Sequence, residues 1–309
     1  MLKFVAQRAL YSFLLLVIAS VLVFVSLRIT PGSVIEKLTT DYNRDTLGPV
    51  LMARFNLDKP ILVQFVLFVN GILHGDLGDS LVTNKPISDM VSESGVYTLI
   101  LGGAGALLTY AIAIPLGVIA AARRNSIIDQ GALFMSVLGM GIPNFFLALL
   151  LIQVFALQLH WLPVAGSQGF SSLILPAVVI SAEAIALNVR LMRSSLLDEL
   201  NREYIRTLRA KGVRERRILW VHAFRNALPP VIALAAVLLR TLVGYTLIVE
   251  VIFRWPGLGS KLVNAIITRD YPVAQVLALL LTAVVLLLNF LADIGQRWAD
   301  PRTREGSRL

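Results

Sequence analysis

Two ionisable side chains, Glu183 and Arg240, lie near the centres of long apolar runs in this 309-residue sequence. A charge in the hydrocarbon core of a membrane is costly, and it is kept there only with a partner or beside water. The two runs would cross a membrane in opposite directions and would place both residues at similar depth. The sequence therefore predicts either an ion pair that only locks two helices together or two charges that face one aqueous cavity. Glu250 lies closer to the end of the second run.

A second candidate for a polar pathway is the run SVLGMGIPNFF, where Gly139, Gly141 and Pro143 interrupt an apolar segment. Proline removes a backbone donor and breaks or kinks a helix. Backbone groups freed in lipid must be satisfied by protein or by a water-filled cavity. Pro143 and Asn144 are therefore candidates to line a pathway, and a kink that is satisfied within the protein is the alternative.

The longest strongly polar stretch between two apolar runs is residues 203–230, EYIRTLRAKGVRERRILWVHAFRNALPP. Eight Lys and Arg side chains stand between Leu196 and Leu228, against four acids. Gly212 interrupts a helical pattern and can adopt a positive φ at little steric cost. The stretch predicts two short helices that meet at this glycine on a membrane surface. On charge alone, an ordinary positively charged cytoplasmic loop is the competing interpretation.

The composition is that of a membrane protein. Hydrophobic residues make up 57% of the chain and charged residues 15%, whereas a soluble domain averages about 25% charged. In this class a net charge of +9 reports topology and contact with anionic lipid rather than nucleic acid. The absence of cysteine excludes disulfides and thiolate metal sites. The first apolar run has no small-residue cleavage site after it and is expected to remain as a span.

The motifs that would support an enzyme are missing from the sequence. It contains no GxxxxGK[ST], no HExxH and no GxSxG, so neither a phosphate-binding loop nor a hydrolytic centre is indicated. Cys/His spacings typical of a metal site are also missing. We therefore expect no catalytic residue, no metal site and no cofactor in this chain.

Six apolar runs reach the length of about 20 residues that a spanning helix needs. An even number places both termini on one side of the membrane. Lys and Arg number 15 in 62 residues on the terminal side and 8 in 101 on the other, which predicts cytoplasmic termini. The expected spans are residues 9–29, 97–121, 132–157, 173–195, 229–253 and 273–298.

The long segment between the first two runs is expected to be structured. Residues 61–73 form an apolar run that is too short to span a membrane. Pro60 suits a helix start, and Gly71 and Gly75 suit its end. We predict a helix packed on the outer face or lying in the interface. The sequence GDLGDSLVTNKPISDMV then predicts turns, followed by a helix that leads into the second span.

Six pieces of the sequence, in order over the whole chain, resemble the B-type permease subunit of dipeptide, oligopeptide and nickel ABC importers. They include the opening residues 1–32, the stretch RLMRSSLLDELNREYIRTLRAKG, and EVIFRWPGLGSKLVNAIITRDYPVAQ. The resemblance implies an all-α integral membrane protein with the type I ABC importer permease fold. It also implies a first transmembrane helix with a long external loop at 1–92, a permease core at 93–298 with a cytoplasmic coupling loop at 196–228, and a cytoplasmic tail at 299–309.

The same resemblance implies partners. These are a second, C-type permease subunit, two ATPase subunits that hold ATP and Mg²⁺, and an extracytoplasmic substrate-binding protein, assembled in the inner membrane of a bacterium or archaeon. No nucleic-acid partner is expected. In the family the cytoplasmic loop forms a coupling helix that sits in a groove of the ATPase. The positions that match it here are Arg206, Thr207, Arg209, Ala210, Lys211, Gly212, Arg216, Arg217, His222, Arg225 and Asn226.

This sequence departs from the family pattern in two respects. The peptide permeases usually have alanine at the position of Leu208, so this residue adds bulk at the coupling loop. Glu183 and Arg240 lie outside the pattern and are therefore candidates for specificity. Arg190 and Arg193, near the inner end of the fourth run, are expected to snorkel or to meet loops.

The sequence leaves the substrate and two other classes open. Peptides are the expected cargo, with nickel chelates, glutathione and opines as alternatives, because a separate binding protein largely selects the ligand in this family. An ion-coupled secondary transporter could use Glu183, Glu250 and Asp293, although we see no inverted repeat between the halves of the sequence. A membrane receptor or scaffold is the third class.

Overall fold

The computed structural model describes residues 2–29, 48–50, 52–53, 56 and 58–299 of the chain. The side chains of residues 2–3, 236, 239–240, 242–243 and 295–299 lie outside this description. The chain divides into two compact units. Unit 1 combines residues 1–98 with 256–290, and unit 2 combines residues 99–255 with 291–309.

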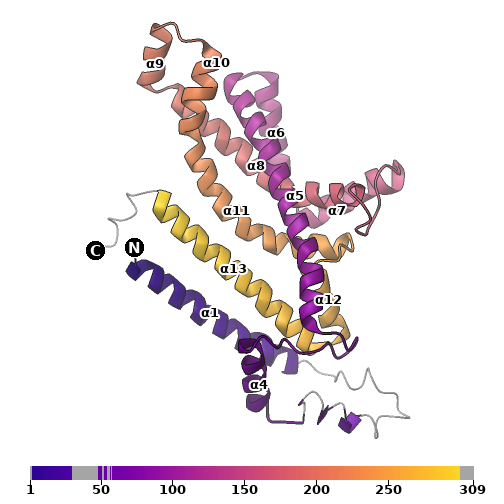
Figure 1. Ribbon diagram of the computed structural model, residues 1–309. Coiled ribbons are helices and arrows are strands. Elements are labelled where there is room, and N and C mark those ends of the chain that lie inside the picture. The colour runs from indigo at the N-terminus through magenta and orange to yellow at the C-terminus, as the bar shows by residue number, and fades with distance from the viewer. Residues whose placement is uncertain (1, 30–47, 51, 54–55, 57, 300–309) are drawn as a thin grey trace. The chain divides into compact units, whose positions relative to one another are not determined.

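Long apolar helices make up most of the described chain (Figure 1). Five have the length and composition to cross a membrane, and a sixth span results if one bent pair of helices counts as a single crossing. The six expected runs are therefore confirmed as helices, one of them broken. The unbroken helices are α1 (Leu2–Ile29), α5 (Ile87–Ala122), α8 (Ser171–Leu200), α11 (Phe224–Ile252) and α13 (Tyr271–Ala299).

The third run breaks at Pro143, as its sequence predicts. Helix α6 (Ile127–Gly141) is followed by α7 (Asn144–Leu151) and the π-helical segment η1 (Ile152–Gln158), and the helix axis bends by 107° between the two parts. Proline disfavours the helical conformation of the residue before it, and Ile142 accordingly adopts φ −92°, ψ 118°. The Ile142 N–H still donates to the Leu138 carbonyl at 3.0 Å, and the Pro143 carbonyl accepts from Leu147 at 3.0 Å. These two backbone groups at the break are thus satisfied within the protein.

Glycine residues of α5 and α6 let these helices lie close to α8 in unit 2. A Cβ atom at Gly117 would lie 2.7 Å from the Met192 Cβ, and one at Gly105 would lie 2.5 Å from a methyl carbon of Ile180. Small residues permit such close helix contacts in lipid, where burial of apolar area provides little driving force. Helix α8 is the central element of unit 2, because α5, α6, α7 and α11 all pack against it.

In unit 1 the short apolar helix α4 (Ile61–Leu73) has the predicted bounds and packs against the end of α1. The Phe24 ring meets the Phe65 ring edge-on at 5.1 Å between centroids. The Arg28 guanidinium lies 3.4 Å from the Phe24 ring centroid and donates to the Gln64 side chain at 2.9 Å. The ring contact between Phe24 and Phe65 and the hydrogen bond from Arg28 to Gln64 attach α4 to α1, while the cation–π contact lies within α1.

The segment between α4 and α5 forms the predicted turns and is attached to the start of α13. Gly75 and Gly78 have positive φ, and Ser80 is buried. The buried carboxylate of Asp270, between α12 (Leu258–Thr268) and α13, accepts from the Ser80 hydroxyl at 2.5 Å and from the Leu81 N–H at 3.0 Å. This carboxylate joins two segments of unit 1 that lie 190 residues apart in sequence.

Candidate functional site

The basic stretch forms a helical hairpin, which confirms the two short helices predicted to meet at Gly212 (Figure 1). Helix α9 (Glu203–Ala210) ends at Lys211, and Gly212 adopts φ +74°. The Gly212 N–H donates to the Arg209 carbonyl at 2.9 Å and the Val213 N–H donates to the Leu208 carbonyl at 3.1 Å. This is the Schellman arrangement, in which a left-handed glycine closes a helix and satisfies its last carbonyls.

The second arm of the hairpin is α10 (Glu215–Arg217) with the π-helical segment η2 (Ile218–Ala223), which continues into α11. Ile205 of α9 and Ile218 of η2 are fully buried, and both belong to one apolar cluster with Met192 and Leu196 of α8. The hairpin is therefore packed onto the end of α8 rather than hanging free.

Leu208, the departure from the family pattern, has a structural role here. Leu208 and Val213 both pack against the apolar cluster beneath the hairpin. In a Schellman motif the side chains at these two positions commonly touch and stabilise the turn. The bulk of Leu208 is directed inward, and we infer that it supports the hairpin instead of enlarging its outer surface.

An ion pair joins the two arms across the Gly212 turn. The Arg209 Nε donates to Glu215 Oε1 at 2.6 Å and its Nη2 donates to Oε2 at 3.3 Å. This bond lowers the pKa of the Glu215 carboxyl and raises the pKa of Arg209. Both side chains are largely exposed, so the pair contributes little energy but sets the direction of both groups.

A second polar link attaches α9 to the ends of α8 and α11. The Tyr204 hydroxyl donates to Glu199 at 2.9 Å and accepts from the Asn226 amide at 3.1 Å. Burial raises the pKa of Tyr204, the bond from Asn226 opposes this rise, and the bond to Glu199 adds to it. Asn226 was singled out by the resemblance, whereas Tyr204 and Glu199 could not be recognised as its partners from sequence spacing.

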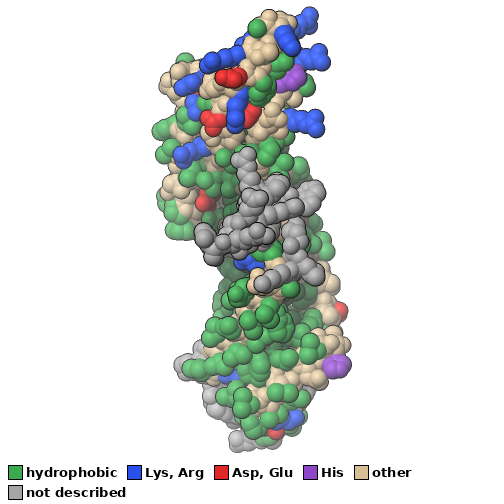
Figure 2. Space-filling view, turned by 90° about the vertical axis from the view of Figure 1, so that its left-hand side faces the viewer, with side chains coloured by type: hydrophobic (Ala, Val, Ile, Leu, Met, Phe, Trp, Pro, Cys, Tyr) green, Lys and Arg blue, Asp and Glu red, His purple; other side chains and the backbone are tan. Residues whose placement is uncertain are grey.

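The predicted coupling residues lie together on the two arms of the hairpin and on the first turn of α11. Figure 2 shows Lys and Arg side chains gathered at the end of unit 2 that α9 and α10 form. His222 is half-buried. The others are exposed: Arg206, Thr207, Arg209, Ala210, Lys211, Gly212, Arg216, Arg217, Arg225 and Asn226.

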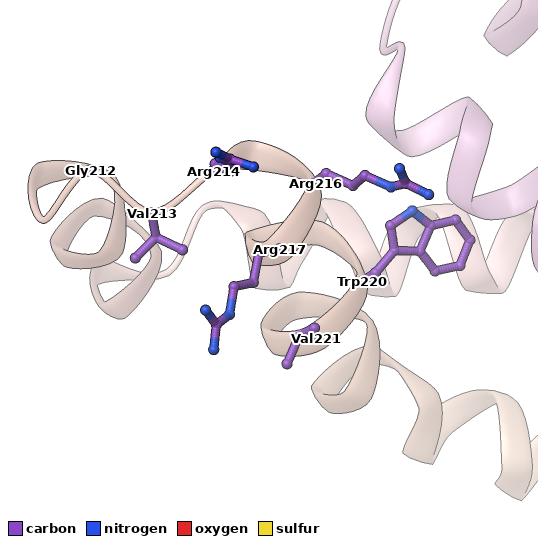
Figure 3. Close-up of a pocket in the computed structure, with 7 residues that line it drawn as sticks. All are labelled: Gly212, Val213, Arg214, Arg216, Arg217, Trp220 and Val221. Atoms are coloured by element: carbon purple, nitrogen blue, oxygen red, sulfur yellow. The ribbon is translucent and has the colours of Figure 1, made fainter.

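An open groove of about 710 Å³ runs along the second arm (Figure 3). Gly212, Val213 and three arginines line it, together with Trp220 and Val221. In Figure 3 Arg216 and Trp220 extend to one side of the arm, whereas Arg217 and Val221 extend to another. Trp220 and Val221 are 44% and 54% exposed, so the groove combines positive charge with apolar surface. Neither Trp220 nor Val221 was among the residues that the sequence resemblance assigns to the coupling loop.

The candidate pathway residues differ in their burial and contacts. Glu183, half-buried on α8, accepts a hydrogen bond from the Tyr245 hydroxyl of α11. The proposed partner Arg240 has its side chain outside the described residues, so the pairing with Glu183 stays a prediction. Glu250 is fully buried. At the break, Pro143 is exposed and Asn144 is half-buried.

The expectation that the arginines of α8 snorkel or meet loops is confirmed for Arg193. Its guanidinium forms a two-pronged ion pair with the buried carboxylate of Asp129, which lies in the first turn of α6, between the second and third expected spans. Arg190 contacts Met140 of α6, with its Nη1 3.4 Å from the sulfur. Asp129 could not be recognised as the partner of Arg193 from sequence, since nothing in its local sequence shows which distant residue faces it.

Solved structures share this fold of long apolar helices. One structure in the set titled "Inward facing conformations of the MetNI methionine ABC transporter" matches with a TM-score of 0.56 and 22% identity. The match covers 70% of this chain and 99% of that chain. At this identity the likeness establishes the fold only.

The family follows from sequence. Residues 113–305 match the model of the family described as "Binding-protein-dependent transport system inner membrane component", and the chain belongs to this family. It is 34% identical to the oligopeptide transport system permease protein AppB of Bacillus subtilis, over 98% of this chain and 99% of that protein. It is 34% identical to the glutathione transport system permease protein GsiC of Escherichia coli, with the same coverage. The resemblance noted from sequence motifs is thus confirmed.

Proposed function

We propose that this chain forms half of the translocation pathway of an ATP-driven peptide importer in the inner membrane of a bacterium or archaeon. The observation that carries the proposal is end-to-end similarity to relatives named for oligopeptide and glutathione transport. Glutathione is itself a small peptide, so both names point to one substrate class. Nickel chelates and opines are the alternative cargoes of the same machinery.

The α9–α10 hairpin is proposed as the surface on which an ATPase subunit docks. Three features support this role: its turn is closed at Gly212, its arms are anchored by Ile205 and Ile218, and its exposed face is basic and partly apolar. A rigid element of this kind can transmit a push or pull to the helix on which it is packed. Docking of two ATPases, one on this chain and one on a second permease, would then drive the spans between inward-open and outward-open arrangements.

The pathway itself is proposed to run along the broken third span and the α8–α11 pair. Pro143 and Asn144 mark the break, and Glu183 provides a carboxylate within the spans. A half-buried carboxylate with a tyrosine partner suits contact with the ammonium group of a peptide. Arg240 and Glu250 are kept as candidates that would contribute in another conformation of the transport cycle.

The proposal is tested by gentle purification of the tagged chain from its native membrane, followed by mass spectrometry and reconstitution with the partners found. We expect a second permease and two ATPase subunits in stoichiometric amounts. Vesicles that contain the complex and its binding protein should accumulate labelled di- and oligopeptides only with ATP. Uptake that persists without ATPases would favour an ion-coupled transporter, and a chain that purifies alone without transport would favour a receptor.

A further inference from the structure

A strongly buried ion pair of unit 2 lies outside both the hairpin and the candidate pathway. The Asp129 carboxylate, 2% exposed, accepts from Arg193 Nε and, at 2.7 Å, from Arg193 Nη2. Asp129 is the third residue of α6 and Arg193 belongs to the last third of α8. A bidentate Arg–carboxylate pair fixes both distance and orientation. It therefore joins the first turn of α6 to α8 in one defined arrangement.

Asp129 also closes the N-terminus of α6. Its Oδ2 accepts from the Asn125 N–H at 2.9 Å, and its own N–H donates to the Ser126 hydroxyl at 3.3 Å. The arrangement resembles a capping box, except that the side chain of the third helical residue accepts from Asn125, one residue before the cap residue Ser126. The carboxylate thus has three donors. The same group starts the helix and attaches it to α8.

The far end of α6 is held to α8 by close packing. A Cβ atom at Gly139 would lie 3.2 Å from the Ala186 Cβ and 3.3 Å from the Ala182 carbonyl oxygen. Arg190 contacts Met140 at the same end. Contacts near both of its ends thus attach α6 to α8, up to the break at Pro143.

The α9–α10 hairpin packs against the part of α8 that carries Arg193. Met192 and Leu196, on either side of Arg193 in sequence, are fully buried in the cluster that contains Ile205 of α9 and Ile218 of η2. Displacement of the hairpin is therefore passed to the last turns of α8 by apolar contacts, and from α8 to α6 by the ion pair.

We propose that Asp129 and Arg193 are a positioning pair, which makes α6 and the break after it follow the hairpin during the transport cycle. The inference rests on the proposed function in one respect, namely that ATPases move the hairpin. Neither residue needs to touch the substrate or the ATPase. Their contribution is to keep the distance and orientation between α6 and α8 constant while both helices move.

The variant Asp129→Asn tests the pair because asparagine keeps the shape and can still accept in the capping box, but it loses the charge. The matched control is Asp89→Asn, which removes an exposed acid from the first turn of α5, outside the coupling loop and the candidate pathway. In reconstituted complexes we expect the peptide transported per ATP hydrolysed to fall about two- to thirtyfold in Asp129→Asn, the range for residues that carry coupling. The control should match the wild type. ATP hydrolysis and assembly should persist in both.

A distance measurement separates positioning from a merely structural role. The chain has no cysteine, so spin labels can be placed at Ile127→Cys on α6, which is 90% exposed, and at Ser194→Cys on α8. In the wild type the α6–α8 distance should stay the same in the ATP-free and ATP-trapped states. In Asp129→Asn it should broaden or shift when ATP is trapped. An unchanged distance and an unchanged transport ratio in Asp129→Asn would overturn the proposal.

If Asp129→Asn fails to assemble, Arg193→Lys takes its place, because lysine keeps the charge but loses the two-pronged geometry. We expect an intermediate transport ratio for this variant, and a wild-type ratio would overturn the proposal. Different outcomes refute the proposed function and the positioning pair. A wild-type complex without ATP-dependent uptake refutes the proposed function, whereas normal uptake that is indifferent to both variants refutes only the positioning pair.

Discussion

Two arginine–carboxylate pairs of similar geometry lie within unit 2, and they differ in burial and in sequence separation. Arg209 and Glu215 are six residues apart and 45% and 66% exposed. Arg193 and Asp129 are 64 residues apart and 19% and 2% exposed. An exposed pair contributes little because water and salt screen it, whereas removal of one partner from a buried pair leaves an uncompensated charge. Ion pairs of similar geometry can therefore differ widely in their contribution to stability.

The largest effect is expected when the buried pair is broken from its cationic side. Arg193→Ala leaves the Asp129 carboxylate buried without its guanidinium, which should lower the free energy of unfolding by about 3–5 kcal/mol. The measurement is denaturation of the purified protein in mild detergent. Arg190→Ala, at an exposed arginine one turn away, is the control and should cost far less. Equal losses for the two variants would show that the ion pair has no special weight.

The turn that places the exposed pair should be more sensitive than the pair itself. Gly212→Pro cannot adopt φ +74° and also lacks the N–H that donates to the Arg209 carbonyl. Local strain of about 1–3 kcal/mol should displace the α9–α10 hairpin and reduce uptake roughly tenfold or more, since 1.4 kcal/mol corresponds to tenfold. Membrane insertion and protein level should stay normal. Gly212→Asn is the control, because asparagine tolerates left-handed φ.

Uptake assays in vesicles, with protein level measured by immunoblot, separate the outcomes for this turn. Wild-type uptake by Gly212→Pro would refute a role of the hairpin in coupling. Loss of uptake in both variants, with normal protein level, would show that the glycine is needed for its small size rather than for its backbone conformation.

The difference between the two pairs also explains what could be predicted from the sequence. The hairpin is local: a glycine, the apolar residues around it and a run of charges lie within about 25 residues, and rules for helix ends apply directly. The break at Pro143 and the bounds of α4 were predictable for the same reason. Span lengths followed from apolar content, which a membrane imposes on each helix separately.

The partners of Asp129 and Glu183 could not be predicted, because each lies on another helix. A span that is apolar on every side gives no periodic signal of which face meets which neighbour. Asp129 looked like an ordinary loop acid, and Tyr245 looked like one more large residue in an apolar run. Only the rotation of α6 and α11 about their axes decides these contacts, and packing sets that rotation.

The Glu183–Tyr245 contact lies between the two extremes, because it is half-buried and involves one neutral donor. A double-mutant cycle with Glu183→Gln and Tyr245→Phe should give a coupling energy of about 0.6–1.7 kcal/mol, the range for side-chain hydrogen bonds between membrane helices. Unfolding in mild detergent provides the free energies. If the two single losses simply add in the double variant, the hydrogen bond contributes nothing to stability.

The smallest effect is expected at the exposed pair, and it should depend on pH in a defined direction. Arg209 lowers the pKa of the Glu215 carboxyl below its ordinary value of 4.5. A group whose pKa is lowered on folding stabilises the fold above its unfolded pKa and loses that contribution as the pH falls through the folded pKa. Glu215→Gln should therefore destabilise the α9–α10 hairpin by about 0.2–1 kcal/mol near pH 7. The difference from wild type should shrink as the pH falls below 4.5 and vanish once the pH is below the lowered pKa of Glu215.

Hydrogen exchange of the Gly212 and Val213 amides measures this difference, because both donate across the end of α9. Protection should be slightly lower in Glu215→Gln than in wild type near neutral pH and equal at low pH. Arg209→Ala should give the same profile, since either change removes the same bond. A difference that persists in acid would mean that Glu215 stabilises the turn by packing and not by its charge. Solvent exposure alone would then not explain why the exposed pair and the buried pair differ in their contribution to stability.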